Sequence, residues 1–233
     1  MMAIKPKDMA KIVDCTVLDP RFTVRDVKNA CDQAKEYNFA AVCVNPCYVP
    51  LTAKLLEESS VKVCTVVGYP LGSNTSETKA FETKSVIRNG AQEIDMVVNV
   101  AAIKEHNWMK VKEDVKAVID ATKIAGVTRD IITKAVLETE YLTEEELETV
   151  CLIIKRLKVD FIAVSSGFDQ NAIIDDVGFI RKLVGRTIGV KATGGIDDFE
   201  TALDMLDAGA NRIGTKSGIS IVIGEEDEID QSF

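Results

Sequence analysis

The sequence predicts a single-domain α/β protein of the (β/α)₈ class, the TIM barrel. Short segments rich in β-branched residues alternate with longer amphipathic segments along the 233-residue chain. Such alternation indicates a parallel sheet with helical crossovers, and eight units in about 230 residues fit a closed barrel. The competing fold, an open doubly wound sheet, usually has a glycine-rich turn after its first strand. Residues 14–20, DCTVLDP, form no such turn.

Eight segments have the composition of buried strands. They are residues 12–18, 41–45, 61–68, 93–99, 131–138, 160–166, 188–193 and 212–215. Helices are expected between them because apolar residues recur at three- and four-residue steps, as at Val111, Val115 and Val118. Thr143 and Glu146 have the spacing of a capping box. The expected helices are residues 24–37, 51–59, 76–89, 108–125, 143–157, 174–184 and 198–208.

Glycines mark where two of these helices end. Asn89-Gly90 and Ala208-Gly209 are helix-stop signals, and the residues that follow them are alike. No low-complexity linker divides the chain, so residues 1–223 are expected to form the barrel. Residues 224–233 are predicted to be an acidic tail.

The net charge argues against two classes of partner. The chain has 28 Lys and Arg against 37 Asp and Glu, which gives a formal charge of −9. Such a chain has no overall field to attract nucleic acid or an anionic membrane, so an anionic substrate needs a local positive pocket. No apolar run approaches the roughly 20 residues of a membrane span, and the first residues lack a signal peptide's apolar stretch. We therefore expect a cytoplasmic protein.

The cysteines and the histidine indicate neither disulfides nor a metal site. The six cysteines lie mainly in apolar runs, and a chain of this size needs no disulfides, so buried free thiols are expected. Cys43 and Cys47 have no second pair of ligands nearby in the sequence, as a zinc site would require. His106 is the only histidine and stands in a polar stretch, where a solvated surface residue is expected.

Ionisable residues interrupt strands that otherwise appear buried. They are Asp14, Asp95, Lys134 with Glu138, and Lys191. A lone charge in a buried strand costs several kcal/mol unless it is paired, so we expect these groups to meet inside the mouth of the barrel. Two interpretations follow, namely a structural ion-pair network or proton-transfer chemistry. The Gly194-Gly195 turn beside Lys191 favours a functional role for that lysine.

Two glycine turns follow the last two predicted strands. Residues 191–196, KATGGI, and 212–218, RIGTKSG, can present backbone N–H groups with no side chain in the way. TIM barrels commonly bind phosphate there with the help of a short helix, which residues 217–223 could supply. Lys216 adds a positive charge. The alternative is that both are plain strand-to-helix turns.

Six motifs resemble deoxyribose-phosphate aldolases over nearly the whole chain. They are residues 42–46 (VCVNP), 63–72 (VCTVVGYPLG), 93–99 (EIDMVVN), 165–168 (SSGF), 190–196 (VKATGGI) and 212–215 (RIGT). The resemblance implies a class I aldolase that needs neither metal nor cofactor. Members of the family cleave 2-deoxy-D-ribose 5-phosphate reversibly into acetaldehyde and D-glyceraldehyde 3-phosphate through a lysine Schiff base. The resemblance also implies a homodimer or a monomer.

The resemblance implies roles for individual residues. Asp95 and Lys191 match the family's proton-relay pair, and Lys134 matches a lysine of its internal charge cluster. Thr16 and Asn45 match polar residues that line the substrate pocket. The phosphate cradle corresponds to Gly167, Gly194, Gly195, Gly214 and Ser217.

The chain departs from the family pattern at the nucleophile. Where members have a lysine on the sixth strand, this chain has Ala163, and Val164 replaces the usual threonine. Lys216 stands where serine is usual. Several members end in a tyrosine thought to reach the site, whereas this chain ends in Phe233.

Three explanations for Ala163 remain open. The first is a relocated nucleophile, with Lys216 or Lys191 forming the imine, and the loss of one lysine with the gain of another favours it. An imine lysine must be largely neutral, and a bound phosphate would hold Lys216 charged. The second is an inactive or engineered chain that still binds the phosphorylated sugar. The third is a diverged barrel that binds small molecules. The substrate is expected to be a small aldehyde or a phosphorylated sugar.

Overall fold

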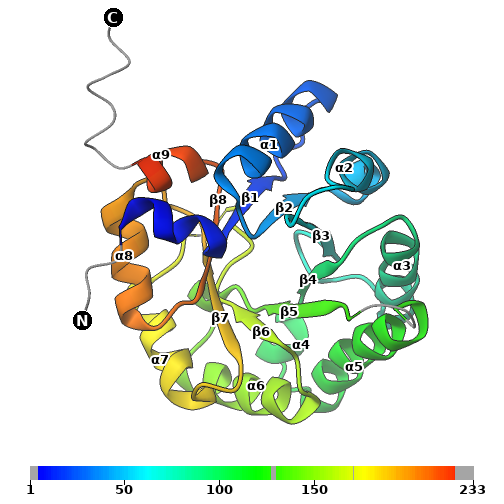
Figure 1. The fold of residues 1–233 in the computed structure, drawn as a ribbon. Helices are drawn as coiled ribbons and strands as arrows, with labels where there is room; N and C mark the ends of the chain where they lie inside the picture. Colours follow the sequence, from blue (N-terminus) through cyan, green and yellow to red (C-terminus); the bar gives the residue numbers. More distant parts are fainter. Residues whose placement is uncertain (1–4, 127–129, 170, 224–233) are drawn as a thin grey trace, which may run out of the picture.

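The chain forms a closed barrel of eight parallel strands (Figure 1). The computed structural model describes residues 5–126, 130–169 and 171–223. Each strand pairs with the next along the chain, and the last pairs with the first, which confirms the predicted fold class. The strands are β1 (Val13–Val17), β2 (Ala41–Val44), β3 (Lys62–Val67), β4 (Glu93–Val97), β5 (Ile132–Val136), β6 (Phe161–Ala163), β7 (Gly189–Thr193) and β8 (Arg212–Thr215).

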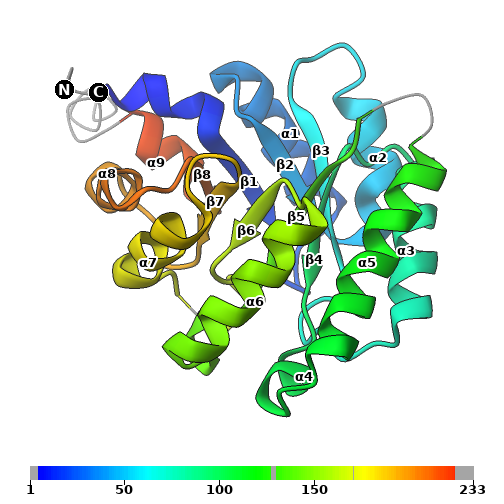
Figure 2. The ribbon, with the colours of Figure 1, turned by 90° about the horizontal axis from the view of Figure 1, so that it is seen from below.

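Helices surround the outside of the barrel (Figures 1 and 2). Short 3-10 helices cover Pro6–Ile12, Pro46–Tyr48 and Thr139–Tyr141. The α-helices are α1 (Val24–Tyr37), α2 (Val49–Leu55), α3 (Ser76–Arg88), α4 (Val100–Lys104), α5 (Trp108–Ala125), α6 (Glu144–Leu157), α7 (Ile174–Val184), α8 (Phe199–Ala208) and α9 (Gly218–Ile223).

The first six strands end one to three residues earlier than the sequence predicted, whereas β7 and β8 end at the predicted residues 193 and 215. The sixth strand stops at Ala163 because the next residues form a turn, in which the hydroxyls of Ser165 and Ser166 accept the N–H groups of Gly167 and Phe168. The fourth strand stops before Asn99, whose side chain caps the unpredicted helix α4. Side chains therefore set the C-terminal strand ends, where apolar composition alone gives no boundary.

The two glycine helix stops are confirmed. Gly90 and Gly209 have φ angles of 116° and 119°, which other residues rarely adopt. In both joints the N–H of the alanine after the glycine donates to a carbonyl of the preceding helix, Ala91 at 3.0 Å and Ala210 at 2.9 Å. The predicted tail 224–233 lies outside the described residues, so the domain boundary at 223 stays a prediction.

The cysteine and histidine predictions agree with the structure. All six cysteines are free, and only Cys47 is exposed. The His106 side chain is 61% exposed. No helix among the described residues has both the length and the apolar character needed to cross a bilayer.

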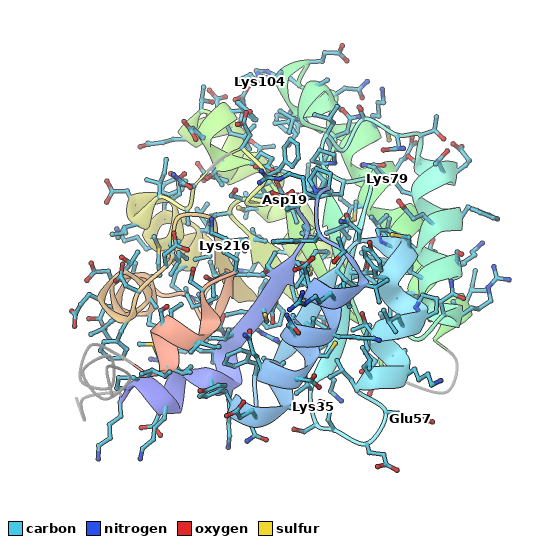
Figure 3. The ribbon with its side chains drawn as sticks, turned by 90° about the horizontal axis from the view of Figure 1, so that it is seen from above. Asp19, Lys35, Glu57, Lys79, Lys104 and Lys216 are labelled. Atoms are coloured by element: carbon cyan, nitrogen blue, oxygen red, sulfur yellow. The ribbon has the colours of Figure 1, made fainter. Side chains whose placement is uncertain are left out.

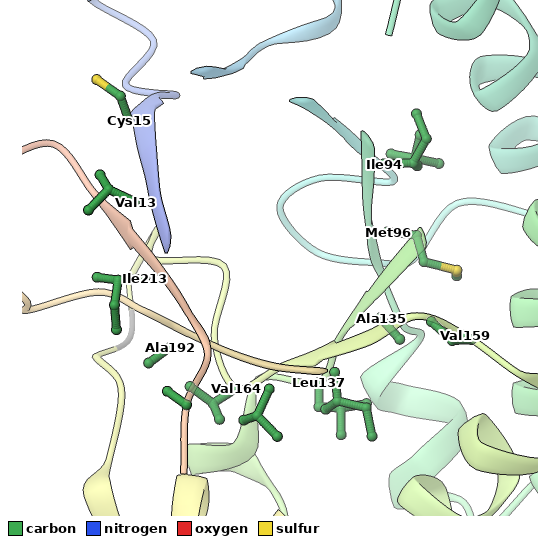
Figure 4. Packing of buried hydrophobic residues seen from close by; sticks show 14 of the residues in the cluster. Val13, Cys15, Ile94, Met96, Ala135, Leu137, Val159, Val164, Ala192 and Ile213 are labelled. Atoms are coloured by element: carbon green, nitrogen blue, oxygen red, sulfur yellow. The ribbon is translucent and has the colours of Figure 1, made fainter. Parts of the chain in front are cut away.

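Successive side chains of each strand point alternately towards the helices and into the barrel, which gives the protein two different interiors. Outward-facing residues such as Val13, Ile94, Leu137 and Ile213 pack in the layer between strands and helices, which is the main hydrophobic core (Figure 4). The inward rows instead carry charge. Six buried residues meet there and are called the charge cluster below: Asp14, Glu93, Asp95, Lys134, Lys191 and Arg212.

Each cation of the charge cluster contacts at least two carboxylates, and Lys134 Nζ also lies 3.6 Å from a third, at Asp14 Oδ2. Lys191 Nζ lies 2.8 Å from Asp14 Oδ2 and 2.6 Å from Asp95 Oδ2. Lys134 Nζ lies 2.6 Å from Asp95 Oδ1 and 2.7 Å from Glu93 Oε2. Arg212 donates to Asp14 Oδ1 at 2.7 Å and to Glu93 Oε1 at 3.1 Å. Three carboxylates thus face three cations, and the formal charges sum to zero.

This arrangement fixes the ionisation of the carboxyls. Burial alone would raise the pKa of Asp14, but Lys191, Lys134 and Arg212 outweigh it and hold that pKa well below its ordinary value. Burial alone would also raise the pKa of Asp95, but the positive charges of Lys134 and Lys191 outweigh burial and lower that pKa. Both carboxyls are therefore ionised at neutral pH.

We predict that acid unfolds this protein through the charge cluster. A carboxyl with a lowered folded-state pKa contributes stability above its ordinary pKa of about 4, and that contribution is lost as the pH falls through the lowered value. Urea unfolding between about pH 6 and pH 2 should show the free energy of unfolding falling steeply below about pH 4. Asp14→Asn should flatten the slope, and Asp32→Asn, at an exposed pair with Lys35, should leave it unchanged. Equal slopes in both variants would contradict this account.

Candidate active site

A cavity of about 470 Å³ opens at the C-terminal ends of the strands, and we call it the outer cavity. Its volume lies within the roughly 300–1,000 Å³ typical of small-molecule sites. Its wall comes from the turns that follow β1, β3, β6, β7 and β8, which is where TIM barrels carry their active sites. The lining residues are Thr16, Leu18, Asp19, Pro20, Phe22, Tyr69, Ser166, Gly167, Phe168, Asn171, Thr193, Gly194, Gly195, Ile196, Asp197, Gly214, Thr215 and Lys216.

The glycines of the outer cavity are required by backbone conformation and close packing. Gly194 and Gly195 have φ angles of 97° and 69°. A Cβ on Gly214 would lie 2.5 Å from Thr193 Oγ1 and 2.9 Å from Lys191 Cε. The backbone of these turns therefore faces the cavity without side chains, as an anion cradle needs.

Lys216 is the only cation lining the outer cavity within the described parts of the chain. On β8, Arg212 reaches into the charge cluster and Gly214 abuts the Lys191 side chain. Residue 216 continues this inward row just beyond the strand end, because side chains alternate along a strand. Lys216 is exposed and close enough to Asp19 to help lower the pKa of that carboxyl, after the larger effect of Arg21. Figure 3 shows Lys216 and Asp19 at the mouth of the barrel.

Below the outer cavity is a smaller space of about 10 Å³, which we call the inner recess. A space of this size holds about one water molecule. Tyr69 lines both spaces, and its ring contacts Phe168 edge-on at 5.8 Å between centroids. The recess is lined by Thr16, Leu18, Cys43, Val66, Tyr69, Asp95, Val97, Val136, Ser165, Ser166, Lys191 and Thr193.

Lys191 forms the floor of the inner recess as an ammonium ion. Burial alone would lower its pKa, but Asp14 and Asp95 together raise it well above the ordinary value. Only 2% of the Lys191 side chain is exposed. A protonated amine can donate a proton but cannot attack a carbonyl, which leaves Lys191 unsuited as an imine nucleophile in this state.

Asp95 connects Lys191 to a buried thiol. The Cys64 thiol donates to Asp95 Oδ1 at 3.3 Å, and Lys134 donates to the same sulfur at 3.2 Å. Burial raises the pKa of Cys64 well above its ordinary value. On its other oxygen, Oδ2, Asp95 accepts from Lys191 Nζ at 2.6 Å, so the two residues of the predicted relay pair are in direct contact.

Position 163 lies beside this pair. Ala163 pairs in register with Lys191 across β6 and β7 and is 1% exposed. Its methyl group belongs to a small apolar cluster with Val97 and Val136, against which Tyr69 packs. The alanine methyl has no amine and so cannot form an imine, and the neighbouring Val164 is fully buried.

The other predicted site residues divide into two groups. Thr16, Gly167, Gly194, Gly195 and Gly214 all line the outer cavity. Three others, Asn45, Lys134 and Ser217, line neither the outer cavity nor the inner recess. Asn45 donates to the Leu18 carbonyl at 3.1 Å, Lys134 lies fully buried in the charge cluster, and Ser217 donates to Asp197 at 2.8 Å. Phe233 lies outside the described residues.

Sequence reasoning missed two members of the charge cluster and misplaced one candidate. Glu93 and Arg212 each begin a strand on its inward row, and this alternation was the signal that could have found them. Glu138 does not join the cluster. It adopts a left-handed backbone conformation, with φ at 53°, and accepts the Ser166 N–H at 3.1 Å, which steadies the turn after β6.

Comparison with known proteins agrees with this geometry. Residues 8–222 match the model of the DeoC/LacD family aldolases. The deoxyribose-phosphate aldolase of Clostridium tetani is 47% identical over 216 residues, covering 92% of this chain and 98% of that protein. The solved structure described as "QR15, an Aldolase" is 36% identical with a TM-score of 0.86, covering 96% of this chain and 97% of that one.

A second solved structure supports the same relationship. The deoxyribose phosphate aldolase of Aeropyrum pernix, described as having a unique tetrameric structure, is 29% identical with a TM-score of 0.87. It covers 96% of this chain and 93% of that one. With its barrel, its glycine turns and its buried charge cluster, the chain belongs to the DeoC/LacD family of aldolases.

Proposed function

We propose that this chain is a class I aldolase-type lyase that acts on 2-deoxy-D-ribose 5-phosphate, with Lys216 as the amine that forms the imine. The observation that carries the proposal is the contrast between the two lysines that face the mouth. Lys191 is held by two carboxylates at 2.6 Å and 2.8 Å, whereas Lys216 lines the outer cavity and has no such ion pair with any residue that the structure describes. The aldolase relatives suggest the substrate.

The outer cavity suits a ring-opened sugar phosphate. Its Gly167, Gly194 and Gly195 turns can cradle the phosphate, while the carbonyl end lies near Lys216. The neutral Lys216 amine attacks the carbonyl carbon, and loss of water gives an iminium ion. The C3 hydroxyl then passes its proton to a water molecule in the cavity, and the C2–C3 bond breaks. The bonding electrons move into the iminium and give an enamine, and D-glyceraldehyde 3-phosphate leaves.

Asp95 and Lys191 act in the second half of this reaction. The enamine carbon takes a proton, which Lys191 can supply through the water-sized inner recess. Hydrolysis of the resulting iminium releases acetaldehyde and restores the Lys216 amine. Asp95, paired with both Lys134 and Lys191, keeps the relay lysine in place and charged.

A second candidate function is binding of the sugar phosphate without turnover. The observation that favours it is the position of Lys216 beside the Gly214 turn, where an ammonium group suits a phosphate ligand. In that case Ala163 leaves the barrel without a nucleophile. The two functions differ in whether a covalent adduct forms on Lys216.

We predict a covalent adduct on Lys216. Incubation with acetaldehyde and borohydride should reduce an imine there, and peptide mass mapping should place the added mass on the Lys216 peptide. Lys216→Ala should lose this adduct, and Lys35→Ala, at an exposed lysine on α1, should keep it. Ala163→Lys is a positive control that places an amine at the family's usual position.

One outcome of the labelling experiment would exclude Lys216 as the nucleophile. If labelling of the Lys216 peptide is no greater than that of surface lysines, while Ala163→Lys becomes labelled at 163, Lys216 is not the nucleophile. The binding function would then stand.

We predict that the glycine turn carries phosphate affinity. Calorimetry should detect 2-deoxyribose 5-phosphate binding at least about tenfold tighter than 2-deoxyribose, a difference of about 1.4 kcal/mol. Gly195→Ala should remove this preference, since a Cβ would lie 2.9 Å from the Asn171 side chain and strain the turn. Gly185→Ala is the matched control, because Gly185 has the same φ of 69° with nothing within 4 Å.

Absence of heat and of a thermal shift with the phosphorylated sugar would exclude both functions. The homodimeric or monomeric state that the resemblance implies and the cytoplasmic location expected from the sequence stay predictions.

A further inference from the structure

Two buried thiols and one carboxylate converge at the inner recess. Cys43 and Cys64 stand opposite each other in the register of β2 and β3, and Asp95 lies on the next strand. Their ligand atoms, two sulfurs and one carboxylate oxygen, all lie within 4.8 Å of one another. We propose that Cys43, Cys64 and Asp95 form a binding site for one soft divalent cation, of the class of Zn²⁺ and Cd²⁺.

The spacing is close to what a tetrahedral ion needs. Zinc–sulfur bonds of about 2.3 Å and zinc–oxygen bonds of about 2.1 Å place neighbouring sulfur and oxygen ligands roughly 3.5 Å apart. The Cys64 sulfur already lies 3.3 Å from Asp95 Oδ1. Cys43 and Asp95 both line the recess, whose single water-sized space can supply the fourth ligand.

Charge balance permits the ion despite the neighbouring lysines. Binding replaces two thiol protons, which leave to solvent, with one doubly charged cation, so the net charge of the buried region does not change. Lys134 and Lys191 each keep a carboxylate when Asp95 turns to the ion. Lys134 retains Glu93 at 2.7 Å, and Lys191 retains Asp14 at 2.8 Å.

A second group of ligand atoms is less suitable. Asp14, Cys64 and Glu93 also lie within 4.8 Å of one another. That group has a single thiol, and Arg212 already binds both of its carboxylates. Soft cations prefer thiolate ligands, which favours the group with two cysteines.

An ion at this site binds Asp95 Oδ1 beside Cys64, while the other oxygen, Oδ2, is the one that accepts from Lys191. The carboxylate of the proposed proton relay is then shared with a cation, so the ion is expected to inhibit turnover. This consequence rests on the proposed function, but the metal site itself does not, and its test needs no activity.

Cadmium titration tests the proposal. The starting protein carries Cys47→Ser, which removes the one exposed thiol among the six. The ultraviolet absorption of cadmium–thiolate bonds should rise and saturate at one ion per chain. Cys64→Ala in that background should weaken binding at least about tenfold, the lower end of what loss of even an outer-shell partner costs. Cys151→Ala, at an equally buried thiol on α6, should have no effect.

Three results would overturn the site: no binding once Cys47 is replaced, unchanged affinity in Cys64→Ala, or equal weakening in Cys151→Ala. Because Cys64→Ala touches the charge cluster, cadmium NMR of the Cys47→Ser protein gives a second measurement. A resonance position typical of two sulfur ligands supports the proposal, and one typical of a single sulfur or of none refutes it.

Discussion

Mutual neutralisation inside the barrel is the constraint on which the rest of the structure depends. Three carboxylates and three cations fill a space that most TIM barrels pack with branched apolar side chains. Removing any single member would leave a buried charge uncompensated, which typically costs about 3–5 kcal/mol. The same pairing determines the protonation states at the site before any ligand arrives, with Asp95 ionised and Lys191 protonated.

This neutrality also bears on where a nucleophilic amine can be accommodated. Asp95 is the one carboxylate among the described residues that line the recess, and Lys134 and Lys191 already pair with it. An amine added at position 163 would therefore be driven towards its neutral, nucleophilic form. In this chain that position carries a methyl group, and Val97, Val136 and Tyr69 close around it. The candidate amine lies instead at Lys216, near Asp19 in the more open outer cavity. Water screens Lys216 more effectively there, so carbonyl chemistry at that residue depends less on the buried charges and more on how the ligand orients its carbonyl.

The sequence was a good guide to the fold and a partial guide to the site. Helix periodicity and caps are local signals, and they placed α1, α5 and α7 at their observed bounds. Strand ends depended on side-chain bonds such as that of Asn99, which composition does not reveal. Charged residues on apolar strands correctly indicated a buried cluster.

The remaining site features depend on three-dimensional placement. Whether Glu138 points inward depends on its left-handed backbone, and no local signal announces that conformation. The proximity of Cys43 and Cys64 depends on the register between β2 and β3. From spacing alone, Cys43 was compared with Cys47, which lies close in the sequence but is exposed in the short helix after β2. Contacts between strands therefore require the barrel geometry, whereas contacts within a helix do not.

Positions 163 and 216 are related through the barrel interior. Ala163 pairs in register with Lys191 on β7, and Lys216 stands at the end of the inward row formed by Arg212 and Gly214. The outer cavity and the inner recess share five lining residues, namely Thr16, Leu18, Tyr69, Ser166 and Thr193. A ligand bound at Lys216 therefore lies next to residues that also border the relay pair.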